Sequence, residues 1–196
     1  MITFDHVTKK YGEKTVFENF SMQFAENAVT VLMAPSGYGK TTLLRLVLGL
    51  EQPDEGKLLG CPTVCAAVFQ EDRLCGAISA VANLALVCNE PRETLAQLLL
   101  EAGLARDALL RPAVSLSGGE ARRVAILRAL VAKADLLVFD EPLKGLDEEA
   151  RERMLELIAK YRRGRTLLWV THDSRDAEFW GCIPLRLDDD APSPRG

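Results

Sequence analysis

The sequence predicts an α/β fold with a mainly parallel sheet and helices on both faces. Short apolar runs typical of strands alternate with segments whose apolar residues recur at helical spacing, which is the pattern of a parallel sheet. The 196 residues are about the length of one domain, and a chain of this size buries enough surface for one core. The composition agrees, since 48% of the residues are hydrophobic and 27% are charged.

The first third of the chain predicts three strands and a buried helix. Residues 2–7 and 16–24 each have the composition of a strand, and residues 29–33 (VTVLM) form the compact run expected of a buried one. Glycine and proline crowd into the next residues. From Leu43 to Leu50 the chain is apolar almost all round, so a helix there must be buried.

The middle of the chain predicts a helical insertion. Residues 52–60 are rich in turn-forming residues, and residues 64–69 indicate a strand. The following stretch, to about residue 114, is rich in alanine and leucine and has no strong strand pattern. We expect helices there around residues 77–87 and 92–102.

The last third returns to alternating helices and strands. Ser117 and Glu120 form the S-x-x-E pattern of a capping box, so a helix is expected to begin at Ser117. Residues 136–139 indicate a strand that ends on Asp140, residues 150–161 a helix with one apolar face, and residues 166–171 a further strand. The acidic and proline-rich tail, residues 188–196, is expected to fray.

Charge, hydropathy and cysteine content exclude several classes of protein. The net charge of −4 argues against a general nucleic-acid binder, which usually carries a basic excess. No apolar run approaches the ~20 residues of a membrane span, and the N-terminus lacks a signal-peptide pattern, so we expect a cytosolic protein. Five irregularly spaced cysteines do not make a disulfide framework, and Cys61 with Cys65 lacks further metal ligands nearby, so buried reduced thiols are expected.

A phosphate-binding loop is predicted between residues 34 and 42. The segment matches G-x-x-x-x-G-K-[ST], except that Ala34 replaces the first glycine. Glycines let several N–H groups turn toward the phosphates, the lysine reaches the β- and γ-phosphates, and the threonine hydroxyl serves Mg²⁺. A plain glycine turn is the alternative, but it does not account for the Gly-Lys-Thr-Thr order. The predicted residues are Ala34, Pro35, Ser36, Gly37, Tyr38, Gly39, Lys40, Thr41 and Thr42.

Two acids follow the strand at residues 136–139. Ligands of parallel α/β sheets bind at the carboxyl ends of the strands, where Asp140 and Glu141 stand. One acid in such a place can hold Mg²⁺ and the other can polarise an attacking water. A solvated Asp-Glu-Pro turn is the alternative; the phosphate loop 100 residues upstream favours the catalytic interpretation.

These motifs indicate a P-loop NTPase, and the remaining ones resemble the ATP-binding cassette (ABC) family. Leu116-Ser117-Gly118-Gly119-Glu120 resembles the family's signature LSGGQ, with glutamate in place of glutamine. Four further positions match in family order: Tyr11 at the adenine-stacking aromatic, Gln70 at the Q-loop, Asp147 at the D-loop and His172 at the switch histidine. Simple helix capping is the alternative for Ser117, and core or turn positions are the alternatives for Tyr11 and His172.

The resemblance implies a site for ATP and Mg²⁺. Lys40, Glu141 and His172 would be catalytic, Thr41, Gln70 and Asp140 would serve the metal, and Tyr11 would stack on adenine. The loop Ser117–Glu120, with Asp147 nearby, would close on the ATP of a second copy. The implied assembly is a head-to-tail homodimer, or a pseudo-dimer with a related ATPase, that holds sandwiched nucleotides.

The resemblance also implies the domain organisation. It predicts one ABC ATPase domain over residues 1–196, with antiparallel N-terminal strands. Residues 1–70 and 116–187 would form the α/β core, residues 72–115 an inserted helical subdomain, and residues 188–196 a frayed tail.

The implied function is that of an ATP-hydrolysing transporter subunit, cytoplasmic and held at the inner face of the membrane by a separate permease. Residues 69–74 (FQEDRL) resemble the ATPases of nitrate, sulfonate and taurine importers, which favours import. A soluble ABC ATPase without a permease and a non-hydrolysing nucleotide sensor are the alternatives. Lys144-Gly145 departs from the commoner Ser-Ala before the D-loop aspartate.

Overall fold

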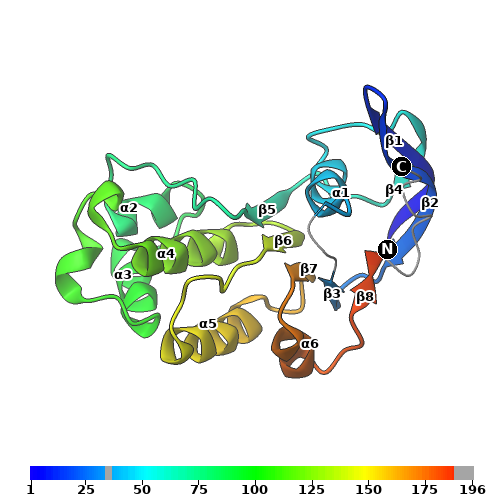
Figure 1. Ribbon diagram of the computed structural model, residues 1–196. Coiled ribbons are helices and arrows are strands. Elements are labelled where there is room, and N and C mark those ends of the chain that lie inside the picture. The colour runs from blue at the N-terminus through cyan, green and yellow to red at the C-terminus, as the bar shows by residue number, and fades with distance from the viewer. Residues whose placement is uncertain (34–36, 188–196) are drawn as a thin grey trace. The chain divides into compact units, whose positions relative to one another are not determined.

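The computed structural model describes residues 1–33 and 37–187 and divides the chain into two compact units (Figure 1). The first unit contains residues 1–65 and the chain from residue 164 onward, and the second contains residues 66–163. The predicted boundaries of the helical subdomain, residues 72 and 115, stay a prediction. The predicted frayed tail, residues 188–196, lies outside the described residues.

An antiparallel sheet of three strands forms one part of the first unit. Its order is β2-β1-β4, and its strands are β1 (Ile2–Tyr11), β2 (Lys14–Phe24) and β4 (Glu55–Leu59). The N-terminal strands are therefore antiparallel, as predicted. Phe4 packs edge-on against Phe20 and Phe24, with ring centroids 5.6 and 5.9 Å apart, so aromatic side chains from alternate positions build the buried face of this sheet.

Strand β4 was not predicted, because residues 52–60 are rich in turn-forming residues and were expected to form turns. Most β4 side chains are exposed, so the segment has no apolar alternation to reveal a strand. Its backbone pairs with β1, with Thr3 opposite Leu59 and Phe4 opposite Leu58. Gly56, at a φ of 78°, lets the two backbones approach, because a Cβ there would lie 2.2 Å from the His6 carbonyl oxygen.

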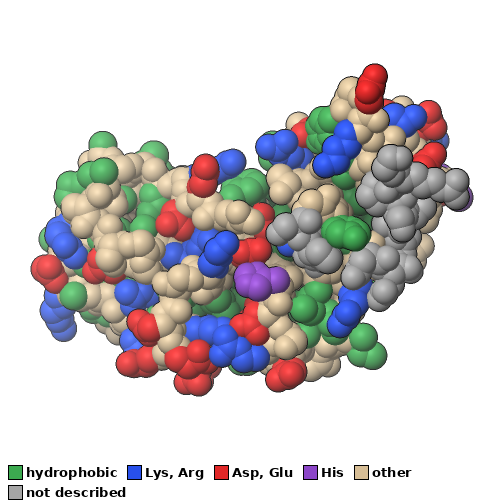
Figure 2. All heavy atoms as spheres, viewed as in Figure 1, with side chains coloured by type: hydrophobic (Ala, Val, Ile, Leu, Met, Phe, Trp, Pro, Cys, Tyr) green, Lys and Arg blue, Asp and Glu red, His purple; other side chains and the backbone are tan. Residues whose placement is uncertain are grey.

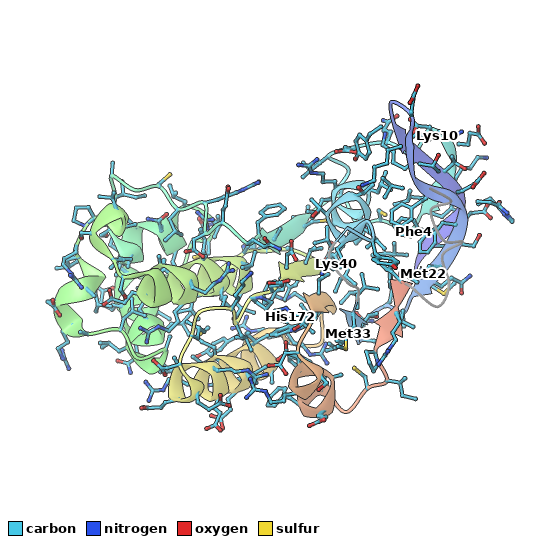
Figure 3. All side chains as sticks on the ribbon, in the orientation of Figure 1. Phe4, Lys10, Met22, Met33, Lys40 and His172 are labelled. Atoms are coloured by element: carbon cyan, nitrogen blue, oxygen red, sulfur yellow. The ribbon has the colours of Figure 1, made fainter. Side chains whose placement is uncertain are left out.

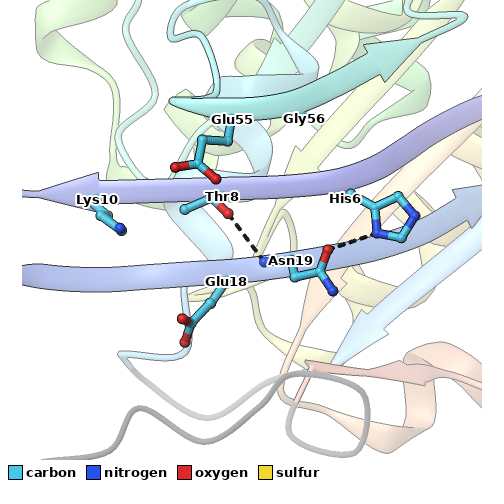
Figure 4. A pocket seen from close by; sticks show the side chains of 7 residues that line it. All are labelled: His6, Thr8, Lys10, Glu18, Asn19, Glu55 and Gly56. Atoms are coloured by element: carbon cyan, nitrogen blue, oxygen red, sulfur yellow. Dashed lines mark hydrogen bonds between the residues drawn. The ribbon is translucent and has the colours of Figure 1, made fainter.

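The same sheet carries a polar hollow of about 480 Å³ (Figure 4). Irregularities in the β1–β2 register lie beside it, and His6 and Asn19 both have a φ of 51°. The His6 ring nitrogen Nδ1 lies 2.7 Å from Asn19 Oδ1, so the two residues are linked across the strands. The lining residues are His6, Thr8, Lys10, Glu18, Asn19, Glu55 and Gly56.

Parallel strands form the other part of the first unit. Strand β3 (Val29–Met33) pairs in parallel with β7 (Thr166–Thr171) on one side and β8 (Leu185–Arg186) on the other. Helix α1 (Lys40–Val47) follows β3, and α6 (Ser174–Trp180) follows β7. The predicted strands at residues 29–33 and 166–171 are confirmed to the residue.

The second unit contains most of the helices. Strand β5 (Cys65–Val68) neighbours β6 (Leu136–Asp140). Helices α2, α3 and α4 pack on one another (Figure 1, green), and α5 follows β6. Their bounds are α2 Ala80–Ala85, α3 Arg92–Glu101, α4 Gly118–Val131 and α5 Glu148–Tyr161, with two 3-10 turns at Arg106–Leu109 and Ala113–Ser115.

Among residues 1–33 and 37–187, none of the helices has the length and hydropathy that crossing a bilayer requires. Acidic and basic side chains are interspersed on the visible face (Figure 2), in keeping with the small net charge. The five cysteines are unbridged, but the expectation that they are buried is wrong: four are half-buried and Cys75 is exposed, because several of them lie in loops or at element ends.

Candidate nucleotide-binding site

The predicted phosphate loop joins β3 to α1. Ala34, Pro35 and Ser36 lie outside the described residues. Gly37 and Gly39 have φ values of 92° and 84°, which favour glycine. Gly39 is the N-cap of α1, and no side chain in the described part of the chain caps the helix there. A helix start of this kind attracts anions through its N–H groups and its dipole.

Close packing fixes the start of α1. A Cβ at Gly39 would lie 2.7 Å from Val16 Cγ1 and 2.8 Å from Phe17 Cζ, so this position accommodates only glycine without a shift in β2. Leu43 and Leu44 of α1 are buried in the core. Tyr38 and Thr41 remain exposed and Thr42 is buried, so the loop presents part of its surface to solvent on a rigid base.

His172 leaves the sheet beside the phosphate loop. Met33, the last residue of β3, pairs with Thr171, the last residue of β7. The loop and His172 therefore emerge from neighbouring strand ends, and Figure 3 shows Lys40 and His172 in this part of the unit. His172 is exposed. Its position suits contact with a ligand held at the start of α1.

Tyr11 ends β1 at the hairpin that leads into β2. Its ring is 42% exposed, and its hydroxyl donates a hydrogen bond to Glu51, beyond the end of α1. This bond, helped by Arg45 and Lys9 against the opposing effect of desolvation, lowers the pKa of Glu51. Lys9 Nζ lies 5.4 Å from the ring centroid. The tether gives the exposed ring a fixed direction, as a stacking platform requires.

Two substitutions of Tyr11 distinguish the stacking of its ring on adenine from the hydrogen bond of its hydroxyl to Glu51. We expect Tyr11→Ala to weaken ATP binding about 10-fold, because base–aromatic stacking contributes about 1–3 kcal/mol. Tyr11→Phe, which keeps the ring and loses the bond to Glu51, should weaken ATP binding less than 3-fold. Equilibrium binding of ATP measures both. Equal losses in the two variants would contradict a stacking role and indicate that the Glu51 tether alone matters.

The second unit holds the predicted acids and Gln70. Asp140 is the last residue of β6, and Glu141 follows it; both are less than one-tenth exposed. Glu141 has a φ of 46°, which is uncommon for a residue other than glycine. Such strained conformations cost about 1–3 kcal/mol and cluster at functional sites. Gln70 is exposed just after β5.

Polar contacts surround the acids and the predicted D-loop. Lys144 Nζ lies 3.2 Å from Glu141 Oε2, so an ammonium group faces the buried carboxylate. Asp147 is the N-cap of α5, and its side chain accepts a hydrogen bond of 2.9 Å from the Ala150 N–H. Asp147 therefore has a structural role in this chain besides the one the resemblance implies.

The signature segment forms the predicted capping box. Glu120 N–H donates to Ser117 Oγ at 3.2 Å, and Ser117 N–H donates to Glu120 Oε2 at 2.8 Å. The Ser117 N–H in particular lowers the pKa of Glu120, with smaller contributions from the Ser117 hydroxyl, Arg111 and Arg123, against the opposing effect of burial. Gly118 has open space around its Cβ position. Capping thus coexists with an accessible helix start.

The lowered pKa makes the contribution of Glu120 to stability depend on pH. The ordinary glutamate value of about 4.3 holds in the unfolded chain, so stability from the carboxylate is present above that pH and is lost as the pH falls through the lower folded value. We expect the free energy of unfolding of the wild type to be about 0.3–1 kcal/mol higher than that of Glu120→Gln at pH 7.

The difference should vanish toward pH 3. Urea unfolding at several pH values measures it. Glu152→Gln is the control, because Glu152 is exposed in the middle of α5. A gap between wild type and Glu120→Gln that persisted at pH 3 would contradict this account.

The donors predicted for Mg²⁺ fit that ion. Thr41 offers a hydroxyl, Gln70 an amide oxygen and Asp140 a carboxylate, and Mg²⁺ is usually bound by one or two carboxylates together with substrate phosphates. Among the described residues no three His, Cys, Asp or Glu side chains gather as an all-protein metal site. A site completed by nucleotide phosphates is consistent with this donor set.

The predicted residues fall into two sets. The first unit holds Tyr11, residues 37–42 and His172, and the second holds Gln70, Ser117–Glu120, Asp140, Glu141 and Asp147. Each set is organised within its own unit, as described above. Two further residues of the site were not predicted from the sequence: Glu51, the partner of Tyr11, and Arg122, whose contacts reach the segments of Gln70 and Glu141. No local pattern marks either residue.

Comparison with known proteins agrees with these motifs. Residues 17–144 match the family model described as ABC transporter. The chain is 39% identical over 181 residues to aliphatic sulfonates import ATP-binding protein SsuB 3 of Rhodococcus jostii, covering 90% of this chain and 67% of the relative. It is 42% identical over 176 residues to SsuB 2 of Pseudomonas syringae, covering 88% and 64%.

A relative named for another cargo is similar as well. The chain is 37% identical over 195 residues to Fe(3+) ions import ATP-binding protein FbpC of Brucella abortus, covering 90% of this chain and 55% of the relative. The chain thus spans between about half and two thirds of the length of these relatives.

Solved structures share the fold. The dimeric structure of MJ0796, a bacterial ABC transporter cassette, matches with a TM-score of 0.83 and 28% identity over 100% of both chains. A post-hydrolysis state of that cassette bound to ADP and Pi matches with a TM-score of 0.82 and 27% identity. The predicted cassette-type fold is therefore confirmed.

Proposed function

The chain belongs to the ABC transporter family and is an ATPase of that family, and we propose from this premise that it powers solute import through a separate membrane permease. Its relatives named for aliphatic sulfonates and for Fe(3+) ions are import ATP-binding proteins, which supports import. The pairing of Met33 with Thr171 supports the nucleotide site in this proposal, because the segment that leads to α1 and the segment that contains His172 leave neighbouring strand ends.

In this proposal the first unit holds the nucleotide. The predicted phosphate loop, residues 34–42, and the Lys40 ammonium bind the phosphates, and the exposed Tyr11 ring stacks on the adenine. His172 donates to the γ-phosphate from the neighbouring strand end. Catalysis here consists largely of positioning and charge stabilisation, as phosphoryl transfer requires.

The second unit supplies the groups for hydrolysis. Asp140 and Gln70 would serve Mg²⁺ from this unit, as Thr41 would from the first, and the bound ion would offset charge that develops on the phosphate oxygens. Glu141 accepts a proton from the attacking water and orients it. Burial of Glu141, which is 8% exposed, fixes its carboxylate for this role.

We further propose that two copies close around two ATP molecules. The Ser117–Glu120 loop at the start of α4 would offer bare N–H groups, a hydroxyl and a helix dipole to a phosphate of the second copy, and Asp147 would take part in the same closure. The dimeric structure of the similar cassette MJ0796 supports this arrangement. The partner is a second copy of this chain or a related ATPase.

The proposed location is the cytoplasmic face of the membrane, where the region from Gln70 to Ser115 would receive a helix of the permease. An aliphatic sulfonate is the cargo to test first, because residues 69–74 and several relatives point to that class. The cargo itself would contact the permease and not this chain.

Co-purification tests the proposal. The Glu141→Gln chain would be expressed in its native host, membranes solubilised with Mg·ATP present, and bound proteins identified; the same preparation without ATP is the control. A multi-span membrane protein at a ratio near 1:1 would support the transporter role. Recovery only as a homodimer would favour a soluble ABC ATPase, and absence of turnover in the wild type would favour a nucleotide sensor.

A further inference from the structure

Arg122 is a buried cation on the signature helix α4. The residue is only 5% exposed. A buried charge is expensive unless ion pairs and hydrogen bonds compensate for its lost hydration. The contacts of the guanidinium group therefore indicate the role of this residue in the structure.

The guanidinium group binds two separate segments of the second unit. Its Nη1 donates to the Phe69 carbonyl at 2.5 Å, and its Nη2 donates to the Gln70 carbonyl at 3.2 Å. The same Nη2 donates to the Glu141 carbonyl at 3.3 Å. Asp72 Oδ1 lies 3.1 Å from Nη1 and balances the charge. One side chain thus joins the segment after β5 to the end of β6.

Arginine is suited to this link. Its planar guanidinium presents five donors in a rigid fork, whereas the ammonium of lysine is a compact point charge. At one end it holds the carbonyl of Glu141, whose φ of 46° needs support from surrounding contacts. At the other end it holds two consecutive carbonyls, those of Phe69 and Gln70, which flank the Cα of Gln70.

The adjacent Arg123 also donates hydrogen bonds to backbone carbonyls, but none of those carbonyls belongs to Gln70 or Glu141. Its guanidinium donates to the carbonyls of Ala102 and Gly103, at 2.9 and 3.0 Å, and to Gly119 at 3.1 Å. Arg123 therefore ties the end of α3 to α4. The two arginines make similar numbers of backbone bonds, but only Arg122 reaches Gln70 and Glu141.

We infer that Arg122 is a positioning residue that couples the Gln70 segment to Glu141, so that a displacement of one changes the placement of the other. The inference rests on the proposed function, because it takes Gln70 and Glu141 as the groups that serve Mg²⁺ and the attacking water. Arg122 acts through these residues and contacts no nucleotide. Its loss should alter turnover and spare ATP binding.

Steady-state ATPase kinetics on the full chain test the inference. We expect Arg122→Gln to lower kcat about 10- to 100-fold and to change KM for ATP less than 3-fold. Arg122→Lys, which keeps the charge opposite Asp72, should recover part of the loss. Arg123→Gln is the matched control: it should lower thermal stability to a similar degree and lower kcat much less than Arg122→Gln does. Equal kcat in the Arg122→Gln and Arg123→Gln variants would overturn the inference.

A double-mutant cycle with Glu141→Gln separates this inference from the proposed function. If Arg122 acts through Glu141, then adding Arg122→Gln to Glu141→Gln should lower kcat less than 2-fold further. A full additive loss would overturn the inference and leave the role of Glu141 intact. Normal turnover of Glu141→Gln would instead refute the role that the proposed function gives to Glu141. Should Arg122→Gln fail to unfold cooperatively, Arg122→Lys takes its place in both experiments.

Discussion

Replacing Glu141 with glutamine is expected to leave ATP bound and to lower its hydrolysis about 10²- to 10⁴-fold, the usual contribution of a general base. The substitution keeps the size and shape of the side chain and removes its ability to accept a proton. The phosphate loop, α1 and Tyr11 are unchanged, so ATP affinity should stay within about 3-fold. Single-turnover hydrolysis and equilibrium ATP binding measure the two effects separately.

Two variants control this experiment. Glu156→Gln makes the same chemical change at an exposed position of α5 and should leave turnover unaltered. Lys144→Met removes the ammonium group 3.2 Å from Glu141 Oε2 and reports whether that ion pair contributes. Near-normal turnover of Glu141→Gln would exclude Glu141 as the base. A loss of ATP binding as large as the loss of turnover would point to a structural effect.

The sequence predicts the fold best where a segment's own pattern decides its structure. Strands β3 and β7 are short apolar runs, and both were predicted to the residue. The start of α4 is also local, because Ser117 and Glu120 satisfy each other's backbone. These elements can be predicted without knowing which segments they pack against.

Prediction from sequence fails where contacts with another segment of the chain determine the structure. Strand β4 is polar and exposed, and it exists because β1 offers it a free edge. Helix α6 has only seven residues, too few to display a helical period, and is capped by Asp173. Strand β8 is two residues paired with Leu32 and Met33. None of these has a pattern that distinguishes it from a loop.

The same distinction between local pattern and packing partners applies to the candidate site. Motif order and spacing indicate which residues are candidates for contact with ATP. The structure pairs Met33 with Thr171, so that two of those motifs follow neighbouring strand ends. Arg122 and Arg123 are consecutive and chemically identical. Only the packing of α4 against its neighbours turns one toward Gln70 and the other toward α3. Sequence alone contains no signal for that choice.

Replacing Gly39 with alanine is expected to destabilise the first unit and to lower ATP affinity at least about 10-fold, a loss of about 1.4 kcal/mol. The new Cβ would meet Val16 Cγ1 at 2.7 Å and Phe17 Cζ at 2.8 Å. Phe17 is 2% exposed and stacks on Phe20 with centroids 4.8 Å apart, so its ring has little room to move. Relief must come from the start of α1, which would shift the N–H groups that face the phosphates.

Gly37→Ala is the matched control, because it separates backbone strain from steric contact. Gly37 has a φ of 92°, similar to that of Gly39, but its added Cβ would meet no atom within 4 Å. Both variants carry the left-handed strain of about 1–2 kcal/mol, and only Gly39→Ala adds the overpacking cost of about 1–3 kcal/mol. Urea unfolding should therefore place Gly39→Ala below Gly37→Ala by that second amount. Equal stability would mean that β2 yields freely, and the rigid base of the phosphate loop would then lose its structural cause.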